Sequence, residues 1–262
     1  MEISIAGQNK SEWGEGPLWW QGRLLYVDIE GCRVCSYDPA SGEEKSWDVG
    51  ERVGTVVPRA SGGLVIAGDR GFAFLDPVSG EVTPIADPER EKLDNRFNDG
   101  KCSPDGRFFA GTISLKKRVG DAALYRLDSN LEVTRAFSGV TNSNGIVWTE
   151  DGGCVFYIDT PRQEVLGFDY DKETGDLSNL RTEFSTSEAV DASPDGMAID
   201  TDGNLWVAFC HGSCVVCFDQ KGEELRRIEL PCREVTAVAF GGEDLGDLYI
   251  TTGIPKDDIE PE

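Results

Sequence analysis

Four oxygen-bearing side chains stand at corresponding places in a repeated sequence pattern: Glu15, Asn98, Asn144 and Asp195. Asn98, Asn144 and Asp195 each lie seven residues before an Asp-Gly pair, and Glu15 lies six residues before Gln21. Glycine follows each of them directly, or after one further residue in the case of Asn98. Two carboxylates and two amides that converge on one point would form an oxygen-rich site for a hard divalent cation.

The same dipeptides have a second interpretation. Asn-Gly and Asp-Gly are common in turns, where the side chain caps a loop. Four occurrences in phase with a repeat favour the metal site over this alternative. Without a cation, Glu15 and Asp195 would repel one another and lose hydration, which raises the free energy of a buried pair.

The elements that must position these residues recur along the whole chain. Turn-like pairs precede short apolar runs at Gln21-Gly22, Ser61-Gly62, Asp105-Gly106, Asp151-Gly152, Asp202-Gly203 and Glu243-Asp244. Successive turns are 40 to 51 residues apart. Short strands separated by Gly/Asp turns at this spacing are typical of propeller blades, whereas a β-sandwich gives no reason for six similar units. The pattern predicts an all-β fold, a six-bladed β-propeller, as a single domain over residues 1–262, with the four side chains facing its central channel.

The net charge of the chain excludes some classes of binding partner. The 262 residues include 25 basic and 48 acidic side chains, for a formal net charge of −23. Such a surface repels nucleic acid and anionic membranes, so we expect neither as a partner. No apolar run approaches the roughly 18 residues of a membrane-spanning helix. Residues 1–10 lack the pattern of a signal peptide. We therefore expect a cytoplasmic protein with no evident protein partner.

The cysteines do not predict a structural metal site. Eight cysteines without a secretion signal indicate reduced thiols rather than disulfides. Two CxxC pairs occur, Cys32/Cys35 and Cys214/Cys217, but both lie in strand-like sequence. Residues i and i+3 of a strand point to opposite faces, which is poor geometry for holding one zinc ion.

Four segments around the candidate residues resemble a known family. They are Glu15-Gly16-Pro17-Leu18-Trp19, Arg96-Phe97-Asn98-Asp99-Gly100-Lys101, Ser143-Asn144-Gly145-Ile146 and Ser193-Pro194-Asp195-Gly196-Met197-Ala198. In order, and across nearly the whole chain, they are similar to the gluconolactonase/regucalcin (senescence marker protein) family. The resemblance implies a six-bladed propeller that hydrolyses small sugar lactones with one divalent cation, namely calcium, zinc, magnesium, manganese or iron(II).

The resemblance also implies roles for individual residues. Glu15, Asn144 and Asp195 match the metal ligands of the family. Arg96 and Asn98 match its substrate-contacting residues, and Asn98 is also expected close to the metal. Asp195 matches the residue proposed there as the general base.

Two other functions remain open at this point. One is hydrolysis of organophosphates or phosphotriesters, and the other is a calcium-binding propeller without turnover. Arg96 favours catalysis, because a site that only binds an ion does not need a guanidinium at its rim. The alternative for Arg96 is a surface ion pair with Glu91 or Asp94. The single histidine, His211, is expected in an exposed loop near the channel mouth, and with no Gly-x-Ser-x-Gly motif a serine hydrolase is disfavoured.

The last blade departs from the family pattern. Relatives are expected to continue into a further strand with a Gly-Gly-aromatic pattern, whereas this chain ends in the acidic segment Pro255–Glu262. The sixth blade would contain Val235–Phe240 and Leu248–Thr252, with Ile3–Ala6 as a candidate strand that closes the ring. We therefore expect this blade to be short or truncated near 253–262.

Overall fold

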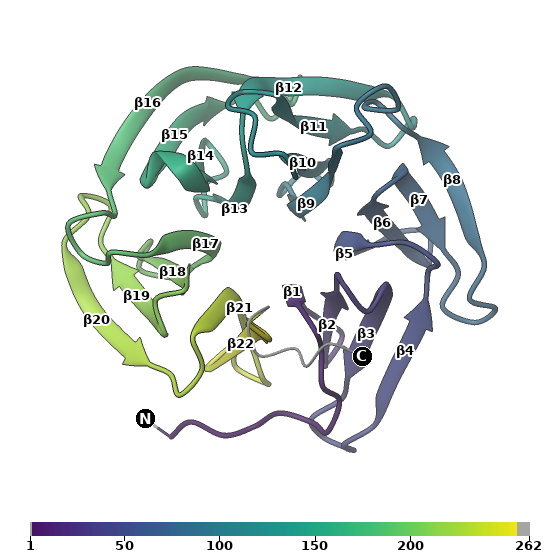
Figure 1. Cartoon of the computed structure of the whole chain (residues 1–262), viewed down its shortest axis with the longest axis horizontal. Coiled ribbons are helices and arrows are strands. Elements are labelled where there is room, and N and C mark those ends of the chain that lie inside the picture. The colour runs from purple at the N-terminus through teal and green to yellow at the C-terminus, as the bar shows by residue number, and fades with distance from the viewer. Residues whose placement is uncertain (1, 256–262) are drawn as a thin grey trace.

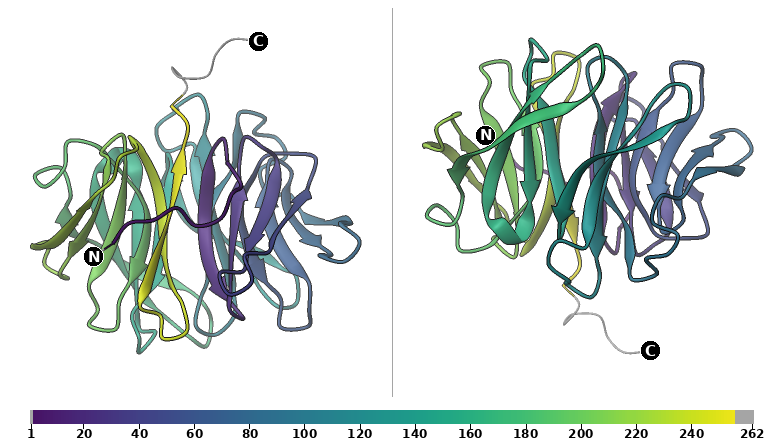
Figure 2. Two further views of the ribbon diagram at one scale, coloured as in Figure 1. Left: turned by 90° about the horizontal axis from the view of Figure 1, so that it is seen from below. Right: turned by 90° about the horizontal axis from the view of Figure 1, so that it is seen from above.

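The computed structural model describes residues 2–255, which form β-strands arranged as a ring around a central axis (Figure 1). Turned on its side, the ring shows strands that run roughly along that axis (Figure 2). One short 3-10 helix, η1 (Thr160–Arg162), interrupts the otherwise all-β chain between residues 2 and 255. No helix within this range has the length and apolar character needed to cross a membrane.

The strands divide into consecutive antiparallel groups. The first group contains β1 (Gly14–Trp20), β2 (Arg23–Asp28), β3 (Arg33–Tyr37) and β4 (Glu44–Asp48), and the second contains β5 (Val53–Pro58), β6 (Leu64–Gly68), β7 (Gly71–Leu75) and β8 (Val82–Ala86). The third contains β9 (Asn95–Cys102), β10 (Phe108–Ser114), β11 (Ala122–Leu127) and β12 (Val133–Val140), and the fourth contains β13 (Ser143–Trp148), β14 (Cys154–Asp159), β15 (Glu164–Tyr170) and β16 (Leu177–Ser185). The remaining strands are β17 (Ser193–Ile199), β18 (Leu205–Cys210), β19 (Cys214–Phe218), β20 (Glu224–Glu229), β21 (Glu234–Gly241) and β22 (Asp247–Gly253).

The prediction of six blades is wrong, because these strands form five sheets. Four sheets have four strands each, and the fifth has six, since β21 and β22 join the sheet of β17–β20. The junction is the pairing of Cys210 in β18 with Glu234 in β21. The last repeat supplies only two strands in the described chain, and an isolated two-stranded hairpin is marginally stable, so this hairpin is continuous with its neighbour.

The ring closes through β1 and β22 rather than through the N-terminal segment. Ile3–Ala6 forms no strand, so its expected role in the last blade is wrong. Instead Trp13 forms a β-bridge with Gly253, and Trp19 stacks on Tyr249 with ring centroids 5.3 Å apart. Figure 1 shows β1 beside β21 and β22, and the expected tail after residue 255 lies outside the described residues.

Apolar side chains from facing sheets fill the spaces between them. The cluster around Phe109, Trp148 and Tyr170, for example, joins the sheet of β9–β12 to that of β13–β16. Successive side chains of a strand point to opposite faces of its sheet, so each strand contributes apolar side chains to the spaces on both sides. Cys214 and Cys217 accordingly lie in two different apolar clusters, on opposite faces of β19, as their spacing predicts. Packing between sheets holds the innermost strands at fixed positions around the channel.

Candidate active site

A break in strand pairing carries each candidate residue to the channel. The register between the innermost strand and its neighbour shifts between Ser143 and Ile146, and again between Pro194 and Met197. Asn144 and Asp195 therefore begin β-bulges, which re-aim side chains that regular pleating would direct at a neighbouring sheet. The register of β9 shifts in the same way around Asn98. These three residues are equivalent in the fold, as their spacing in the sequence predicts.

Glu15 reaches the channel by a slightly different register. It still pairs with Val27 of β2, and the shift follows it, before Leu18. Glu15 thus lies one position earlier on its strand than Asn144 or Asp195 does. The bulge then contains Gly16, whose φ of 54° is in the left-handed region that favours glycine. The shorter spacing in the sequence has a separate cause, since only Gln21 and Gly22 connect β1 to β2, whereas residues 149–153 connect β13 to β14.

The glycines that follow the candidate residues allow the innermost strands to approach one another. A Cβ on Gly145 would lie 2.5 Å from Met197 Cβ, and one on Gly196 would lie 2.3 Å from Ala237 Cβ. Both positions are inside strands. The interpretation of Asn-Gly and Asp-Gly as loop-capping turns is therefore wrong here, since these glycines serve close packing around the axis.

Side-chain hydrogen bonds link the candidate residues across three sheets. Arg96 Nη1 donates to Asn98 Oδ1 over 2.7 Å, and Asn98 Nδ2 donates to Asn144 Oδ1 over 2.9 Å and to the Ser143 carbonyl over 2.8 Å. Asn144 Nδ2 in turn donates to Thr160 Oγ1 over 2.7 Å. The Thr160 hydroxyl donates to the carbonyl of Pro194, the residue before Asp195. This chain of donors and acceptors fixes which end of the Asn144 amide faces Asn98.

Three buried carboxyl groups share this part of the channel: Glu15, Asp99 and Asp195. Burial, reinforced by the nearby Asp99, raises the pKa of Glu15 from 4.5 to about 8, although the Gly16 N–H and Arg96 oppose the rise. Burial and the charge of Glu15 likewise raise the pKa of Asp195 well above its usual value. A bound cation would relieve this concentration of negative charge.

Arg96 places a positively charged guanidinium group next to these carboxyl groups. Only 8% of it is exposed, and burial lowers its pKa to about 10, assisted by the charge of Arg52. Asp94 instead pairs with Arg118, so the surface ion pair considered for Arg96 is not formed with that residue. Among the described residues, the buried Arg96 Nε has no hydrogen-bond partner. A buried donor without a partner is costly, and a bound ligand can satisfy it.

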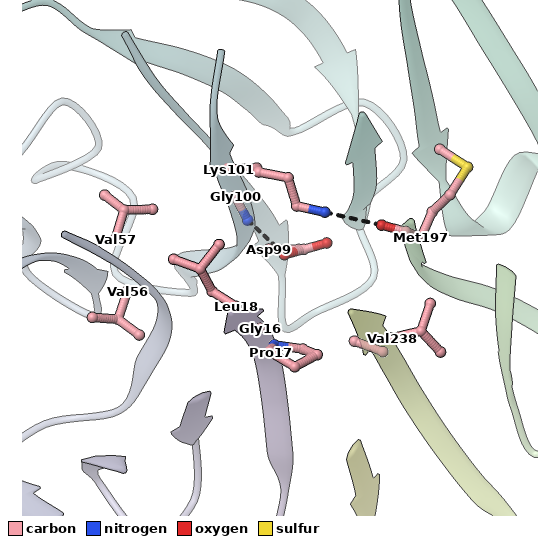
Figure 3. Close-up of a pocket in the computed structure, with 11 residues that line it drawn as sticks. Gly16, Pro17, Leu18, Val56, Val57, Asp99, Gly100, Lys101, Met197 and Val238 are labelled. Atoms are coloured by element: carbon pink, nitrogen blue, oxygen red, sulfur yellow. Dashed lines mark hydrogen bonds between the residues drawn. The ribbon is translucent and has the colours of Figure 1, made fainter. Parts of the chain in front are cut away.

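A lysine crosses the channel further along β9. Lys101 Nζ donates to the Met197 carbonyl of β17 over 3.1 Å, as Figure 3 shows, and the strand between them in the ring is β13. The neighbouring cavity, beside Asp99 and Gly16, has a volume of about 10 Å³, roughly enough for one water molecule. Lys101 lies three residues beyond Asn98, near the end of β9. It therefore lies between the candidate site and the face of the ring at which the innermost strands end.

The opposite face is the mouth of the site. Cys210 pairs with Ser193 at the start of β17, and the Thr160 N–H donates to the Asn142 carbonyl just before β13. The loop histidine, His211, follows Cys210 and is half exposed, as expected for a mouth loop. The sequence motifs predicted no role for Asp99 or Thr160. Asp99 stands inside the Arg96–Lys101 motif, whereas no local signal distinguishes Thr160.

Known proteins resemble this chain over nearly its whole length. Residues 13–254 match the family model described as "SMP-30/Gluconolactonase/LRE-like region". The chain belongs to this family. It is 45% identical over 265 residues to regucalcin of Danio rerio, covering 99% of this chain and 89% of the relative. The resemblance inferred from the four motifs is thus confirmed.

Solved structures of family members share the fold. A luciferin-regenerating enzyme superposes with a TM-score of 0.89 at 31% identity, covering 97% of this chain and 88% of the other. The calcium-binding protein regucalcin from Agrobacterium tumefaciens also gives a TM-score of 0.89, at 25% identity, covering 95% and 85% of the two chains. The chain, with its 262 residues, therefore matches most of the length of each of these two proteins.

The donor set fits a divalent cation. Glu15 and Asp195 offer carboxylate oxygens, and Asn144 Oδ1 retains one lone pair beyond the one that accepts from Asn98. Thr160 prevents the Asn144 amide from turning its nitrogen inward. All of these donors are oxygens, which suit hard cations such as calcium, magnesium and manganese and are also used by zinc and iron(II).

Proposed function

We propose that the protein is a divalent-metal-dependent hydrolase of small sugar lactones. The observation that carries the proposal is the pair of buried carboxyl groups, Glu15 and Asp195, whose charges interact with the buried Arg96. Arg96 is connected through Asn98 to the fixed oxygen of Asn144. The description of the matching family model includes gluconolactonase, which supports sugar lactones as the substrate class. We also keep the cytoplasmic location as a prediction.

The metal would be held by Glu15, Asn144 and Asp195. When bound, a divalent cation polarises a carbonyl and stabilises the negative charge that develops on its oxygen. The name of the Agrobacterium relative, a calcium-binding protein, supports calcium as one candidate. Zinc, magnesium, manganese and iron(II) remain candidates because the donor set does not discriminate among them.

Asp195 would act as the general base. Water attacks the lactone carbonyl carbon and gives a proton to the Asp195 carboxylate, which typically contributes about 10²–10⁴-fold to the rate. The bond from that carbon to the ring oxygen then breaks, and the ring oxygen takes up the proton. The product is the open-chain hydroxy acid, and Asp195 returns to its starting state.

Arg96 and Asn98 would bind the sugar. The Arg96 Nε–H, which has no partner in the described part of the chain, supplies a donor to a lactone or hydroxyl oxygen. Both amide hydrogens of Asn98 are engaged by Asn144 and Ser143, so Asn98 would meet the substrate through Oδ1, as an acceptor from a sugar hydroxyl.

The test is hydrolysis of a panel of small aldonolactones, followed as acid release in weak buffer. Asp195→Ala and chelation should each abolish metal-dependent turnover while circular dichroism shows a folded chain. Asp202→Ala, which changes an exposed turn carboxylate, is the matched control and should retain full activity. If metal-loaded wild type accelerates none of the lactones, the proposal is wrong.

A calcium-binding propeller without turnover is the second candidate, favoured by the name of the Agrobacterium relative. It predicts tight calcium binding and no hydrolysis of any lactone. The buried Arg96 argues against it, because the repulsion between a guanidinium and a cation weakens a site built only to bind an ion. If the protein binds metal but hydrolyses no lactone, phosphotriesters are assayed next, before a calcium-binding propeller without turnover is accepted.

A further inference from the structure

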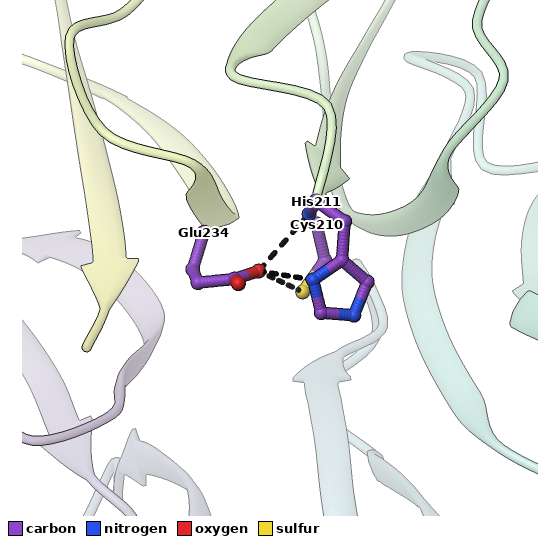
Figure 4. Close-up of side chains that lie close together, drawn as sticks. All are labelled: Cys210, His211 and Glu234. Atoms are coloured by element: carbon purple, nitrogen blue, oxygen red, sulfur yellow. Dashed lines mark hydrogen bonds and ion pairs between the residues drawn. The ribbon is translucent and has the colours of Figure 1, made fainter. Parts of the chain in front are cut away.

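A second group of ligating side chains lies at the channel mouth, beside the oxygen-rich site. It consists of Cys210, His211 and Glu234, whose sulfur, nitrogen and oxygen atoms all lie within 4.8 Å of one another. Figure 4 shows the thiol and the imidazole directed at the same carboxylate. His211 Nδ1 is 2.5 Å from Glu234 Oε2, and Cys210 Sγ donates to the same oxygen over 3.3 Å.

The backbone holds this cluster in place. Cys210 ends β18 and Glu234 begins β21, and the two residues pair where the last hairpin joins the fifth sheet. The backbone N–H of His211 donates to Glu234 Oε2 over 3.1 Å. Cys210 is buried and Glu234 is only 2% exposed, whereas the His211 side chain is 50% exposed. Two ligands are thus rigid, and the third lies next to solvent, from which an ion can enter.

The arrangement does not suit a nucleophilic thiol. An activated cysteine needs a base that takes its proton, and such a base is usually a histidine. Here Glu234 Oε2 stands between the two groups and accepts from the thiol, while Arg233 lies 3.8 Å from the other oxygen, Oε1. The three atoms that converge on one point are a sulfur, a nitrogen and an oxygen, which is the mixture of donors found in zinc sites.

We propose that Cys210, His211 and Glu234 bind a thiophilic divalent cation, with zinc as the representative ion and the fourth position open. Thiolate ligands select zinc and related ions over calcium and magnesium. This site therefore differs in metal preference from the site of Glu15, Asn144 and Asp195, whose donors are all oxygens. Three protein ligands with one open position resemble a reactive rather than a purely structural zinc site.

The test uses the reduced, metal-stripped protein with excess calcium, which occupies oxygen sites but does not bind thiolates. Cobalt(II) is titrated as a spectroscopic probe and then displaced with zinc. We expect one cobalt equivalent with a thiolate-to-cobalt charge-transfer band, which zinc abolishes. Cys210→Ser should remove the band, and His211→Asn should weaken zinc binding at least tenfold.

Two features of the variants keep the test decisive. His211 has a φ of 68°, a conformation that asparagine tolerates, so His211→Asn should fold even if Cys210→Ser does not. Cys154→Ser, which changes a half-buried cysteine of another sheet, is the matched control and should keep the band. The proposal is overturned if folded wild type gives no band, or if the band and the zinc affinity survive in His211→Asn. The readout is metal binding alone, so the result does not depend on lactone hydrolysis.

Discussion

The amide of Asn98 donates to Asn144 Oδ1 over 2.9 Å, and this hydrogen bond joins the innermost strands of two neighbouring sheets at the candidate active site. Asn98 also accepts from Arg96, and Asn144 also donates to Thr160. The proposed substrate-binding residues and the proposed metal ligand are therefore parts of one hydrogen-bonded network. A substitution at one end of the network should therefore alter the position of the side chains at the other end.

Thr160→Val tests the end of this network at η1. Loss of the hydroxyl removes the acceptor of Asn144 Nδ2 and the donor to Pro194, so the Asn144 amide is free to turn. We expect metal affinity to fall about 10–100-fold, as is typical when a residue that orients a ligand is lost. Isothermal titration with calcium and manganese measures this effect. Thr160→Ser should restore affinity, and Thr149→Val, at a half-buried turn, should have no effect. Equal affinities for Thr160→Val and wild type would refute this role of Thr160.

Arg96→Lys tests the other end. Lysine keeps the positive charge but lacks the Nε–H that has no partner among residues 2–255, so substrate should lose one hydrogen bond. We expect kcat/KM for the best lactone to fall about 10–100-fold, which corresponds to about 1.4–2.8 kcal/mol of lost transition-state binding. Arg118→Lys, at an exposed ion pair with Asp94, is the conservative control. Steady-state kinetics that are identical for Arg96→Lys and wild type would contradict a substrate contact.

The buried Glu15 should make the metal-free protein less stable as the pH rises. Its pKa is about 8 in the folded chain against an ordinary value of 4.5, so the folded state holds the proton more tightly than the unfolded state does. This contribution to stability is complete below about pH 4.5 and is lost as the pH rises through about 8. One such group changes the free energy of unfolding by at most about 1.4 kcal/mol per pH unit.

Urea denaturation of chelated protein between pH 5 and 8.5 measures this dependence. The difference in unfolding free energy between wild type and Glu15→Gln isolates the Glu15 contribution from that of other carboxylates. As the pH rises, we expect the unfolding free energy of the wild type to fall relative to that of Glu15→Gln. Excess divalent cation should cancel this change, because cations bind deprotonated carboxylates. A difference that is flat across this range would show that Glu15 titrates normally.

Gly196→Ala should destabilise the fold by about 1–3 kcal/mol, the usual cost of overpacking. The added Cβ would lie 2.3 Å from Ala237 Cβ and 3.0 Å from the Thr236 carbonyl, so β17 and β21 would have to separate. Gly153→Ala is the matched control, because its Cβ would meet no atom closer than 3.5 Å. Thermal denaturation followed by circular dichroism compares the two variants. A melting temperature as high for Gly196→Ala as for Gly153→Ala would mean that the strands do not need this close approach.

The repeat in the sequence was sufficient to predict the β-propeller class and the shared position of Asn98, Asn144 and Asp195. Alternating apolar runs and Gly/Asp turns at a constant spacing are local signals, and equal local geometry places corresponding residues at equal depth in the channel. The four motifs around Glu15, Asn98, Asn144 and Asp195 likewise predicted the family. What the repeat did not predict is the number of sheets, because that number depends on whether Glu234 pairs with Cys210 across the junction of two units.

Only the tertiary structure brought together residues that are far apart in the chain. Thr160 orients Asn144 through a side-chain hydrogen bond, and Cys210 contacts Glu234, 24 positions further along the chain, across a strand junction. Neither pair leaves a periodic pattern in the sequence, because contacts between side chains of different strands depend on how whole strands are placed rather than on local propensity. The sequence by itself determined which side chains could do chemistry, and the fold decided which of them share a charge environment.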